Sequence, residues 1–280
     1  MIEVAAGPWQ LALLPERGAA MARLRHRGRD LIEPLPEGAD PNRTPAGAFL
    51  MLPWANRLAD GLLSLPDGGA HRFPINRPDE NNAIHGLSRD RPWTVAATEA
   101  AGEARLKQSL DEGPYAYDAA LDVRALPDAL RLTLAVTSRA AAPVPYGMGW
   151  HPFFRRPAGA RVGFRAASRL VVDARGLPLR SERSQGMEDA DPVGQDTHYA
   201  GWDGTALLRL GALDLQLRAE GAWARNLQVY APASRAVLAV EPVSHAPDAA
   251  NRPWLGEFGS MTVLRSGETL TGSVELRVIG

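Results

Sequence analysis

Glycine and proline are distributed along the whole chain and divide it into short segments. The 280 residues include 27 glycines and 23 prolines, and no single linker concentrates them. Within the segments, apolar residues tend to occupy every second position, as leucine and valine do between Leu130 and Val136. A period of two is typical of a β-strand with one buried face. Helical periodicity is weak throughout, and residues 248–258 indicate only a loop or a short turn of helix.

Turn-forming residues separate the expected strands at short intervals. Proline-containing turns join three strand pairs in the first half, at Pro15–Gly18, Pro66–Gly69 and Pro127–Asp128. The strands that we expect are residues 9–14, 19–26, 62–65, 71–75, 121–126, 129–137, 206–210, 213–217, 227–230 and 237–240, with a closing strand after Ser266–Glu268. Many short strands with turns between them predict an all-β fold, a large antiparallel sandwich or barrel. The sequence has no repeat of fixed period, and we expect residues 1–280 to form a single domain.

Charge and composition restrict the partners and the compartment. The formal net charge of -1 argues against nucleic acid or an anionic membrane as the main partner. The chain has no cysteine, which excludes disulfides and cysteine-ligated metals. The N-terminus has no basic region followed by a long apolar run, so we expect no signal peptide. No segment has the apolar length of a membrane helix, and we expect a cytoplasmic protein.

The first candidate for chemistry is a histidine in the aromatic stretch YGMGWHPFF, residues 146–154. An imidazole titrates near neutral pH, so His151 can both give and take a proton. Pro152 biases His151 toward an extended backbone. Trp150, Phe153 and Phe154 can wall such a site from water. The alternative is a core histidine whose ring bonds to a backbone carbonyl.

The second candidate is a carboxylate that follows the apolar residues 237–240. Glu241 ends this expected strand and precedes Pro242. A buried carboxylate is unfavourable unless it is paired or hydrogen-bonded. If Glu241 is partly desolvated, its pKa rises toward that of a useful general base. The alternative is an exposed glutamate at the edge of the sheet.

Other polar residues in apolar surroundings complete the set. Asn56 and Arg57 follow a tryptophan, and a guanidinium suits either sugar hydroxyls or a carboxylate partner. The alternative for Arg57 is a structural ion pair with Asp60 or another acid. His85 precedes a glycine that permits a tight turn, and Asp196 precedes an aromatic-rich run.

Tryptophans accompany nearly all of these clusters, and no motif indicates a different chemistry. We expect indole faces to stack on a sugar ring, while arginine, aspartate and histidine bind its hydroxyls. The chain has no GxSxG nucleophile motif and no phosphate-binding glycine loop. The charged run Arg89–Arg91 is expected to be a solvated face or an internal ion pair.

Five stretches, in this order, resemble the aldose 1-epimerase (galactose mutarotase) family. They are PWANRLADG at residues 53–61, NNAIHGLSRDRPW at 81–93, YGMGWHPFF at 146–154, QDTHYAGWDG at 195–204 and AVEPVSHAPDAAN at 239–251. Each stretch is short, but their order and approximate spacing match the family over nearly the whole chain. The resemblance implies a galactose mutarotase-like antiparallel β-sandwich. It also implies that the protein interconverts the α and β anomers of a free aldose without a cofactor.

The resemblance also implies roles for individual residues. His151 matches the general acid that protonates the ring oxygen, and Glu241 matches the general base that deprotonates the C1 hydroxyl. The residues that match sugar-binding positions are His85, Arg57 and Asp196, with Asn56 in support. At neutral pH this chemistry requires a histidine that starts protonated and a glutamate that starts ionised. We expect the two groups on opposite sides of the anomeric end of the sugar.

Two departures from the family pattern leave the substrate open. Leu87 stands where the best-known galactose mutarotases have a second glycine, and this chain is shorter than they are. Both features resemble the divergent bacterial branch of the family, whose substrates vary. A hexose 6-phosphate or an unusual sugar is therefore an alternative. Arginines near the cleft can hold a phosphate or can be surface charges; the candidates are Arg89, Arg91, Arg155 and Arg156.

Other classes of function require other residues than a mutarotase does. A non-catalytic carbohydrate-binding protein on the same fold needs neither an acid nor a base. A lyase or hydrolase needs a second well-placed carboxylate, for which Asp196 is the one candidate. A metal site formed by His85, His151 and Glu241 matches no familiar ligand spacing, so we expect no metal. The expected partner is a sugar substrate, and the protein is a monomer or a homodimer.

Overall fold

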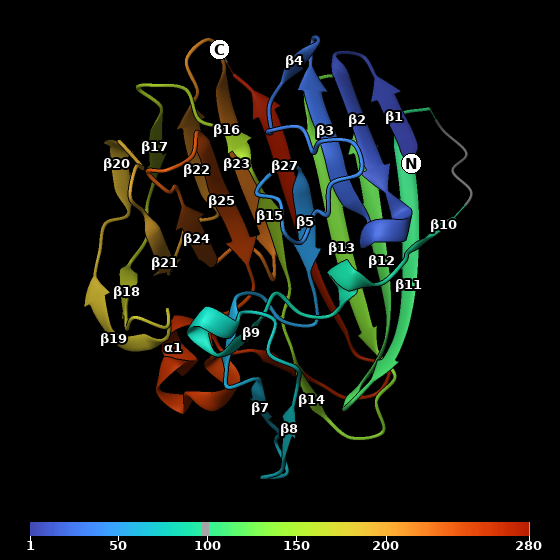
Figure 1. Ribbon diagram of the computed structural model, residues 1–280, viewed down its shortest axis with the longest axis vertical. Coiled ribbons are helices and arrows are strands. Elements are labelled where there is room, and N and C mark those ends of the chain that lie inside the picture. The colour runs from blue at the N-terminus through green and yellow to red at the C-terminus, as the bar shows by residue number, and fades with distance from the viewer. Residues whose placement is uncertain (97–100, 280) are drawn as a thin grey trace.

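The computed structural model describes residues 1–96 and 101–279, and two large antiparallel sheets account for most of it (Figure 1). The larger sheet has 12 strands. Its main path is β1 (Ile2–Ala6), β2 (Trp9–Leu14), β3 (Ala20–His26), β5 (Ala48–Met51), β15 (Gly149–Pro152), β25 (Val237–Val243), β24 (Asn226–Tyr230), β21 (Asp196–Ala200), β18 (Ser168–Val172) and β19 (Pro178–Arg183). Two short strands lie off this path: β4 (Arg29–Asp30) pairs with β3, and β16 (Phe154–Arg155) pairs with β25.

The second sheet has nine strands and includes the longest ones of the chain. Its order is β10 (Thr94–Ala96), β11 (Glu103–Glu112), β12 (Tyr115–Ala125), β13 (Leu130–Ser138), β27 (Thr269–Val278), β23 (Asp214–Gly221), β22 (Thr205–Arg209), β17 (Arg161–Phe164) and β20 (Met187–Ala190). All pairings between neighbouring strands are antiparallel. The two sheets confirm the predicted all-β class and the antiparallel β-sandwich.

Small elements connect the sheets and lie around the site described below. Three two-stranded ladders pair β6 (Arg57–Ala59) with β9 (Asn82–Ile84), β7 (Leu62–Ser64) with β8 (Ala70–Arg72), and β14 (Val144–Tyr146) with β26 (Thr262–Leu264). The 3-10 turns are η1 (Pro15–Arg17), η2 (Pro78–Glu80), η3 (Ser88–Asp90), η4 (Ala249–Asn251) and η5 (Pro253–Leu255), and α1 (Gly256–Gly259) is a single helical turn. No helix in the described part of the chain is long and apolar enough to cross a membrane.

One large hydrophobic cluster lies between the two sheets. Alternate residues of each strand reach it, because successive side chains of a strand point to opposite faces. On β13, Leu130, Leu132, Leu134 and Val136 are all buried in this cluster, as their spacing predicts. On β15, Trp150 belongs to the same cluster, whereas His151 points to the other face of the larger sheet. A small second cluster covers part of that other face, with Phe49 and Phe153 among its members.

The strand bounds agree with the sequence prediction where the alternation is regular. Residues 9–14 form β2 as expected, and the predicted strand 237–240 forms the first part of β25. Glu241 does not end that strand, because β25 continues to Val243. The 10-residue strand β11 was not among the expected strands. Its inward positions include Gln108 between Leu106 and Leu110, and this polar residue interrupts the apolar pattern.

Candidate active site

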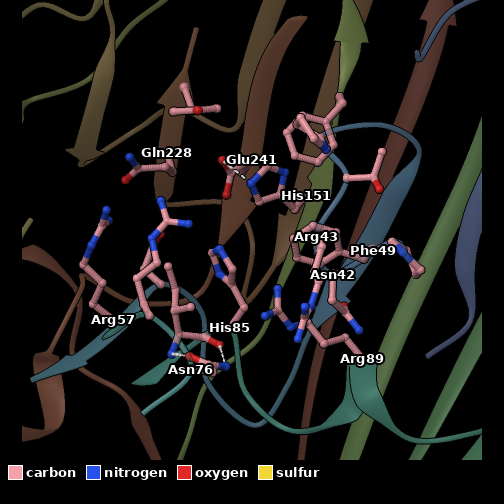
Figure 2. Close-up of a pocket in the computed structure, with 18 of the residues that line it drawn as sticks. Asn42, Arg43, Phe49, Arg57, Asn76, His85, Arg89, His151, Gln228 and Glu241 are labelled. Atoms are coloured by element: carbon pink, nitrogen blue, oxygen red, sulfur yellow. Dashed lines mark hydrogen bonds and ion pairs between the residues drawn. The ribbon is translucent and has the colours of Figure 1, made fainter. Parts of the chain in front are cut away.

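All six residues predicted for the site line one open pocket of about 320 Å³. The pocket lies on the outer face of the larger sheet, away from the main hydrophobic cluster (Figure 2). His151, Glu241 and Asp196 come from strands of that sheet, and Arg57 begins β6. The remaining two, Asn56 and His85, lie in the segments that flank β6 and β9. Segments from five regions of the sequence therefore meet at this pocket.

A single row of residues across four strands forms the floor of the pocket. Phe49 on β5 lies opposite His151 on β15, and Gln228 on β24 lies opposite Glu241 on β25. Between these two pairs, Gly149 of β15 lies opposite Val243 of β25. Counting two residues along each antiparallel strand from that pair brings His151 opposite Glu241. The order across the sheet is therefore Phe49, His151, Glu241 and Gln228, and all four line the pocket.

The two candidate proton-transfer groups are in direct contact. Nε2 of His151 lies 3.3 Å from Oε1 of Glu241, and both side chains are buried. Phe49 stacks on the imidazole with ring centroids 4.6 Å apart, and the Phe153 ring lies at 4.5 Å. These rings exclude water from the imidazole, as the aromatic stretch predicts for Phe153. Trp150 and Phe154 instead pack in the main cluster, so that part of the expectation is wrong.

Burial sets the protonation of this pair in the protein without ligand. Burial, with a smaller effect of the Arg89 charge, lowers the pKa of His151 to about 3. Burial and then the Asp196 carboxylate raise the pKa of Glu241 well above its usual value, and Arg57 acts in the opposite direction. The pair therefore favours a neutral imidazole beside a protonated carboxyl. The expected charge-separated starting state is thus not the one that burial favours, and the two groups lie side by side instead of facing each other.

His85 lies beside this pair in a left-handed backbone conformation. Its φ is 66°, and Gly86 follows with a φ of 72°, so the chain turns tightly here as predicted. The backbone N–H of His85 donates to the carbonyl of Asn56 at 2.9 Å. The His85 ring lies edge-on to the His151 ring, with centroids 5.4 Å apart. Burial, followed by the charge of Arg89, lowers the pKa of His85 well below its usual value, which makes it a neutral hydrogen-bonding group.

Arg57 lines the pocket and also forms a partly buried ion pair. Its Nε donates to Oε2 of Glu80 at 2.7 Å, and its Nη2 donates to Oε1 at 3.2 Å. The partner is therefore Glu80; Asp60 pairs instead with Arg175 at 2.7 Å. This two-point contact fixes the plane of the guanidinium. The Nη2 atom also lies 3.8 Å from a carboxylate oxygen of Asp196.

Asp196 lies at the mouth of the pocket and is about half exposed, with 49% of its side chain accessible. The amide of Gln228 donates to its Oδ1 at 2.7 Å and so orients the carboxylate. Gln228 was missed by the sequence analysis, because a glutamine within an apolar strand has no distinctive motif. Its register opposite Glu241 becomes visible only when the strands pair.

Several buried polar atoms of the pocket residues have no partner within the described part of the chain. They are Nδ1 of His85, Nδ1 of His151, Nδ2 of Asn56, Oε1 of Gln228, Oε2 of Glu241, Oδ1 of Asn42 and Nε of Arg89. Buried polar groups are normally hydrogen-bonded, and an unpaired one is costly. The set contains donors and acceptors close together. A ligand with several hydroxyls, each able to donate and accept, suits it well.

Two expectations about the surroundings of the site are wrong. No tryptophan is among the residues that line the pocket; its aromatic residues are Phe49, Phe153 and Tyr230. The tryptophans of the motifs fill the core instead, except for Trp254, which is 43% exposed. Arg89 is not part of a solvated face but is buried in the pocket wall.

Two further residues hold the Arg57 segment in place. The backbone N–H of Ala55 donates to Nε2 of His245 at 3.0 Å, and that of Ala59 donates to Oδ1 of Asp248 at 3.0 Å. Both side chains belong to the stretch 239–251 that also supplies Glu241. Such contacts join residues about 190 positions apart, which no local sequence pattern reveals. Among residues 1–96 and 101–279, no group of three histidine, aspartate or glutamate side chains is arranged to hold a metal ion.

Comparison with known proteins relates this chain to a family. The sequence model of the family "Aldose 1-epimerase" matches residues 10–277. The uncharacterized protein YphB of Escherichia coli K12 is 26% identical over 258 residues, which cover 84% of each chain.

Solved structures share the fold across almost the whole chain. A galactose mutarotase-like protein from Clostridium acetobutylicum aligns with a TM-score of 0.87 at 18% identity, covering 99% of this chain and 94% of that one. A galactose 1-epimerase from Lactobacillus acidophilus aligns with a TM-score of 0.74 at 17% identity, covering 98% and 92%. These structures share the all-β sandwich, and the family model spans nearly the complete sequence. The chain therefore belongs to the aldose 1-epimerase family.

Proposed function

We propose that this protein is an isomerase that interconverts the α and β anomers of a free aldose, that is, an aldose whose anomeric hydroxyl is unsubstituted. The contact between Nε2 of His151 and Oε1 of Glu241 on the pocket floor carries this proposal. Opening the sugar ring requires one proton to reach the ring oxygen O5 and another to leave the C1 hydroxyl oxygen O1. Both oxygens are bonded to C1, so the groups that serve them must be neighbours.

The side-by-side pair meets this requirement. In the direction of ring opening, the Glu241 carboxylate takes the proton from O1 while the protonated His151 gives its proton to O5. The C1–O5 bond breaks, and an aldehyde forms at C1 with a hydroxyl at C5. Rotation about the C1–C2 bond then presents the other face of the aldehyde. Ring closure returns both protons and gives the opposite anomer, so the pair ends as it began.

Moving one proton within the pair converts its resting state to the form that opens the ring. Neutral imidazole with carboxylic acid, and imidazolium with carboxylate, contain the same number of protons. Conversion between these two forms needs only a proton transfer along the 3.3 Å contact. The neutral form that burial favours is also the form that the pair has after ring opening. Burial therefore favours ring opening once the pair is charge-separated, but it makes that charge-separated form less populated. Sugar hydroxyls that donate to the Glu241 carboxylate stabilise the charge-separated form.

The remaining predicted residues would bind and orient the sugar. Asn56, Arg57, His85 and Gln228 offer donors and acceptors around the pair, and Asp196 offers a carboxylate at the pocket mouth. Binding the sugar with O1 and O5 within reach of His151 and Glu241 accelerates the reaction, because the reacting groups are already close and correctly oriented. A carbohydrate-binding protein would gain nothing from a buried glutamate and histidine in contact, since burying ionisable groups costs stability.

Anomer exchange measured by NMR, on a panel that includes glucose and galactose, tests this function. We expect the protein to accelerate exchange, and Glu241→Gln to reduce the rate by about 100-fold or more, the usual size of an acid–base contribution. Glu188→Gln is the matched control, because Glu188 is exposed on β20 and lies outside the pocket. If the Glu241 variant exchanges anomers at the wild-type rate, Glu241 is not the base. If no aldose of the panel is accelerated, the proposed function is wrong.

A further inference from the structure

His245 is a buried histidine that the proposed mechanism does not use. It lies four residues after Glu241, beyond the end of β25, and is only 1% exposed. Its Nε2 accepts the backbone N–H of Ala55 at 3.0 Å, and its Nδ1 lies 2.8 Å from the carbonyl oxygen of Ala246. Both ring nitrogens therefore have backbone partners, and His245 is not among the residues that line the pocket.

The two backbone partners define the protonation of the His245 ring. An amide N–H only donates, so Nε2 is the unprotonated nitrogen that accepts it. A carbonyl only accepts, so the ring proton is on Nδ1, which donates to Ala246. Burial lowers the pKa of His245 to about 4, and the hydrogen bond with the Ala246 carbonyl acts in the opposite direction. The imidazole is therefore neutral at pH 7 and has one tautomer.

The His245 ring lies where three segments that carry pocket residues meet. The backbone N–H of Gly147 donates to the carbonyl of Pro53 at 2.6 Å. The backbone N–H of Met148 donates to the hydroxyl oxygen of Ser244 at 2.8 Å. These bonds join the segment of the pocket arginine, the segment that precedes the proton-transfer histidine and the segment that follows the glutamate.

The ring packs directly against the backbone at Gly147, four residues before His151. A Cβ on Gly147 would lie 2.0 Å from Cδ2 and 2.2 Å from Nε2 of His245. Any side chain larger than that of glycine would therefore displace the imidazole. Packing this close leaves the ring little freedom to move, so its Nε2 presents a fixed acceptor to Ala55.

The Ala55 hydrogen bond lies at the start of a left-handed turn. Asn56, the next residue, has a φ of 53°, which a non-glycine residue seldom adopts. The carbonyl of Asn56 accepts the backbone N–H of His85 at 2.9 Å, and Arg57 then begins β6. Three pocket residues therefore depend on the backbone geometry that His245 holds at Ala55.

Asp248 holds the other end of this segment through a broader network. Its backbone N–H donates to the carbonyl of Arg57 at 2.8 Å, and its Oδ1 accepts the N–H of Ala59 at 3.0 Å. The same carboxylate accepts hydrogen bonds from two further side chains. The bond between His245 and Ala55 differs, because a single substitution can remove it or keep it.

We propose that His245 is a positioning residue: its neutral ring holds the backbone at Ala55 and so orients the sugar-binding residues that follow relative to Glu241. This inference rests on the proposed function for its effect on turnover, but the positioning itself can be measured without a sugar. Since His245 does not line the pocket, it acts only through other residues. Loss of the Ala55 bond should therefore impair sugar binding more than the proton transfers.

Two amide substitutions separate the hydrogen bond from the loss of the ring. The Oε1 of His245→Gln can occupy the position of Nε2 and keep an acceptor for Ala55, whereas the shorter side chain of His245→Asn reaches only the position of Nδ1. We expect His245→Asn to lower kcat/KM for anomer exchange by about tenfold, mainly through a higher KM. His245→Gln should retain most of the wild-type kcat/KM.

Val136→Ala is the control for destabilisation. It truncates a buried side chain of the main hydrophobic cluster on β13, outside the pocket. All variants are assayed at a temperature at which each is folded, and Val136→Ala should then keep the wild-type kcat/KM. An equal loss in His245→Asn and His245→Gln, or no loss in either, would overturn the proposal.

NMR without a sugar measures the positioning directly. The Nε–H of Arg57 donates to Glu80 at 2.7 Å in a partly buried contact, so its hydrogen exchange should be slow. We expect this exchange to be about tenfold faster in His245→Asn and close to the wild-type rate in His245→Gln and Val136→Ala. The ¹⁵N signals of the wild-type imidazole should show a proton on Nδ1 and none on Nε2 at pH 7.

The two kinds of measurement distinguish this proposal from the proposed function. A His245 ring protonated at Nε2, or unchanged Arg57 exchange in His245→Asn, refutes the positioning role whether or not a sugar is turned over. Faster Arg57 exchange in that variant, without turnover of any aldose by the wild type, supports the positioning role and refutes the proposed function. If His245→Asn does not fold, the tautomer in the wild type still decides whether Nε2 is the acceptor.

Discussion

His151 on β15 and Glu241 on β25 lie opposite each other on adjacent antiparallel strands, and their side chains meet at 3.3 Å. Two residues further along, Gly149 and Val243 pair in the same ladder. Because the backbone positions both groups, neither depends on a loop for its location. This pairing also keeps an ionisable couple buried, which affects stability as well as chemistry.

We expect Glu241→Gln to stabilise the protein increasingly as the pH rises. The folded-state pKa of Glu241 is raised, so above about pH 4.5 the unfolded chain releases this proton while the folded chain keeps it. The wild type therefore loses stability with rising pH, by up to about 1.4 kcal/mol per pH unit from this group, and glutamine does not. Denaturant unfolding of both proteins at pH 5 and pH 7.5 measures the difference. A difference that is the same at the two pH values contradicts the prediction; Glu188→Gln is the control.

We expect buried histidines to make the protein less stable in acid. Burial lowers the pKa of His198 to about 4, although its Nε2 contacts Oδ1 of Asn226 at 3.1 Å. Between the unfolded-state value of 6.5 and pH 4, the unfolded chain binds the proton first, so stability falls as the pH falls. His198→Gln should remove up to about 1.4 kcal/mol per pH unit from this slope, whatever its effect at pH 7. Urea unfolding at pH 7, 6 and 5 gives the slope, and an unchanged slope means that His198 is not responsible.

Gly86 holds the turn that presents His85, and we expect Gly86→Ala to be strongly destabilising. A Cβ on Gly86 would lie 2.2 Å from the carbonyl oxygen of Leu52, which cannot move freely. The matched control is Gly68→Ala, because Gly68 also has a positive φ but has no atom within 4 Å of such a Cβ. Gly68→Ala should lower the free energy of unfolding by about 1 kcal/mol, because of the backbone conformation alone. Gly86→Ala should lower it by about 2 kcal/mol more. If the Gly86→Ala and Gly68→Ala variants unfold at the same temperature, the contact with the Leu52 carbonyl does not destabilise the protein, and the prediction is wrong.

Glu80 is expected to act as a positioning residue through Arg57. Glu80→Gln removes the charge and one acceptor of the two-point contact, so the guanidinium loses its fixed plane. We expect kcat/KM for anomer exchange to fall by about tenfold, with most of the change in KM. Glu112→Gln breaks a similar carboxylate–arginine contact on the surface and should leave kcat/KM unchanged. If both variants behave alike, Glu80 has no specific role.

The sequence predicted the residues of the pocket better than it predicted their partners. The sequence pattern places Arg57 in the site, but it does not distinguish the nearby acid Asp60 from any other carboxylate as its partner. Glu80 becomes the partner because β6 pairs with β9, which brings η2 beside Arg57. That pairing depends on the tertiary fold and leaves no periodic pattern in the sequence.

Arg89 and the tryptophans were misjudged for a related reason. The composition of the charged run Arg89–Arg91 favours a solvated surface. In the structure, Arg89 is buried at the turn η3, whereas Asp90 and Arg91 are exposed. The tryptophans lie next to the site residues in sequence, yet adjacent residues of a strand point to opposite faces. Trp150 therefore enters the core because His151 faces the pocket.

The floor and the rim of the pocket have different origins. The floor residues belong to paired strands, whereas much of the rim comes from connecting segments, including residues 41–45, 76–77 and 235. Connecting segments tolerate substitution and insertion more readily than paired strands. Under the proposed function, changes in the rim can therefore alter which sugar is accepted without moving His151 and Glu241. A fold divided in this way would let new substrate preferences evolve while the proposed reaction is retained.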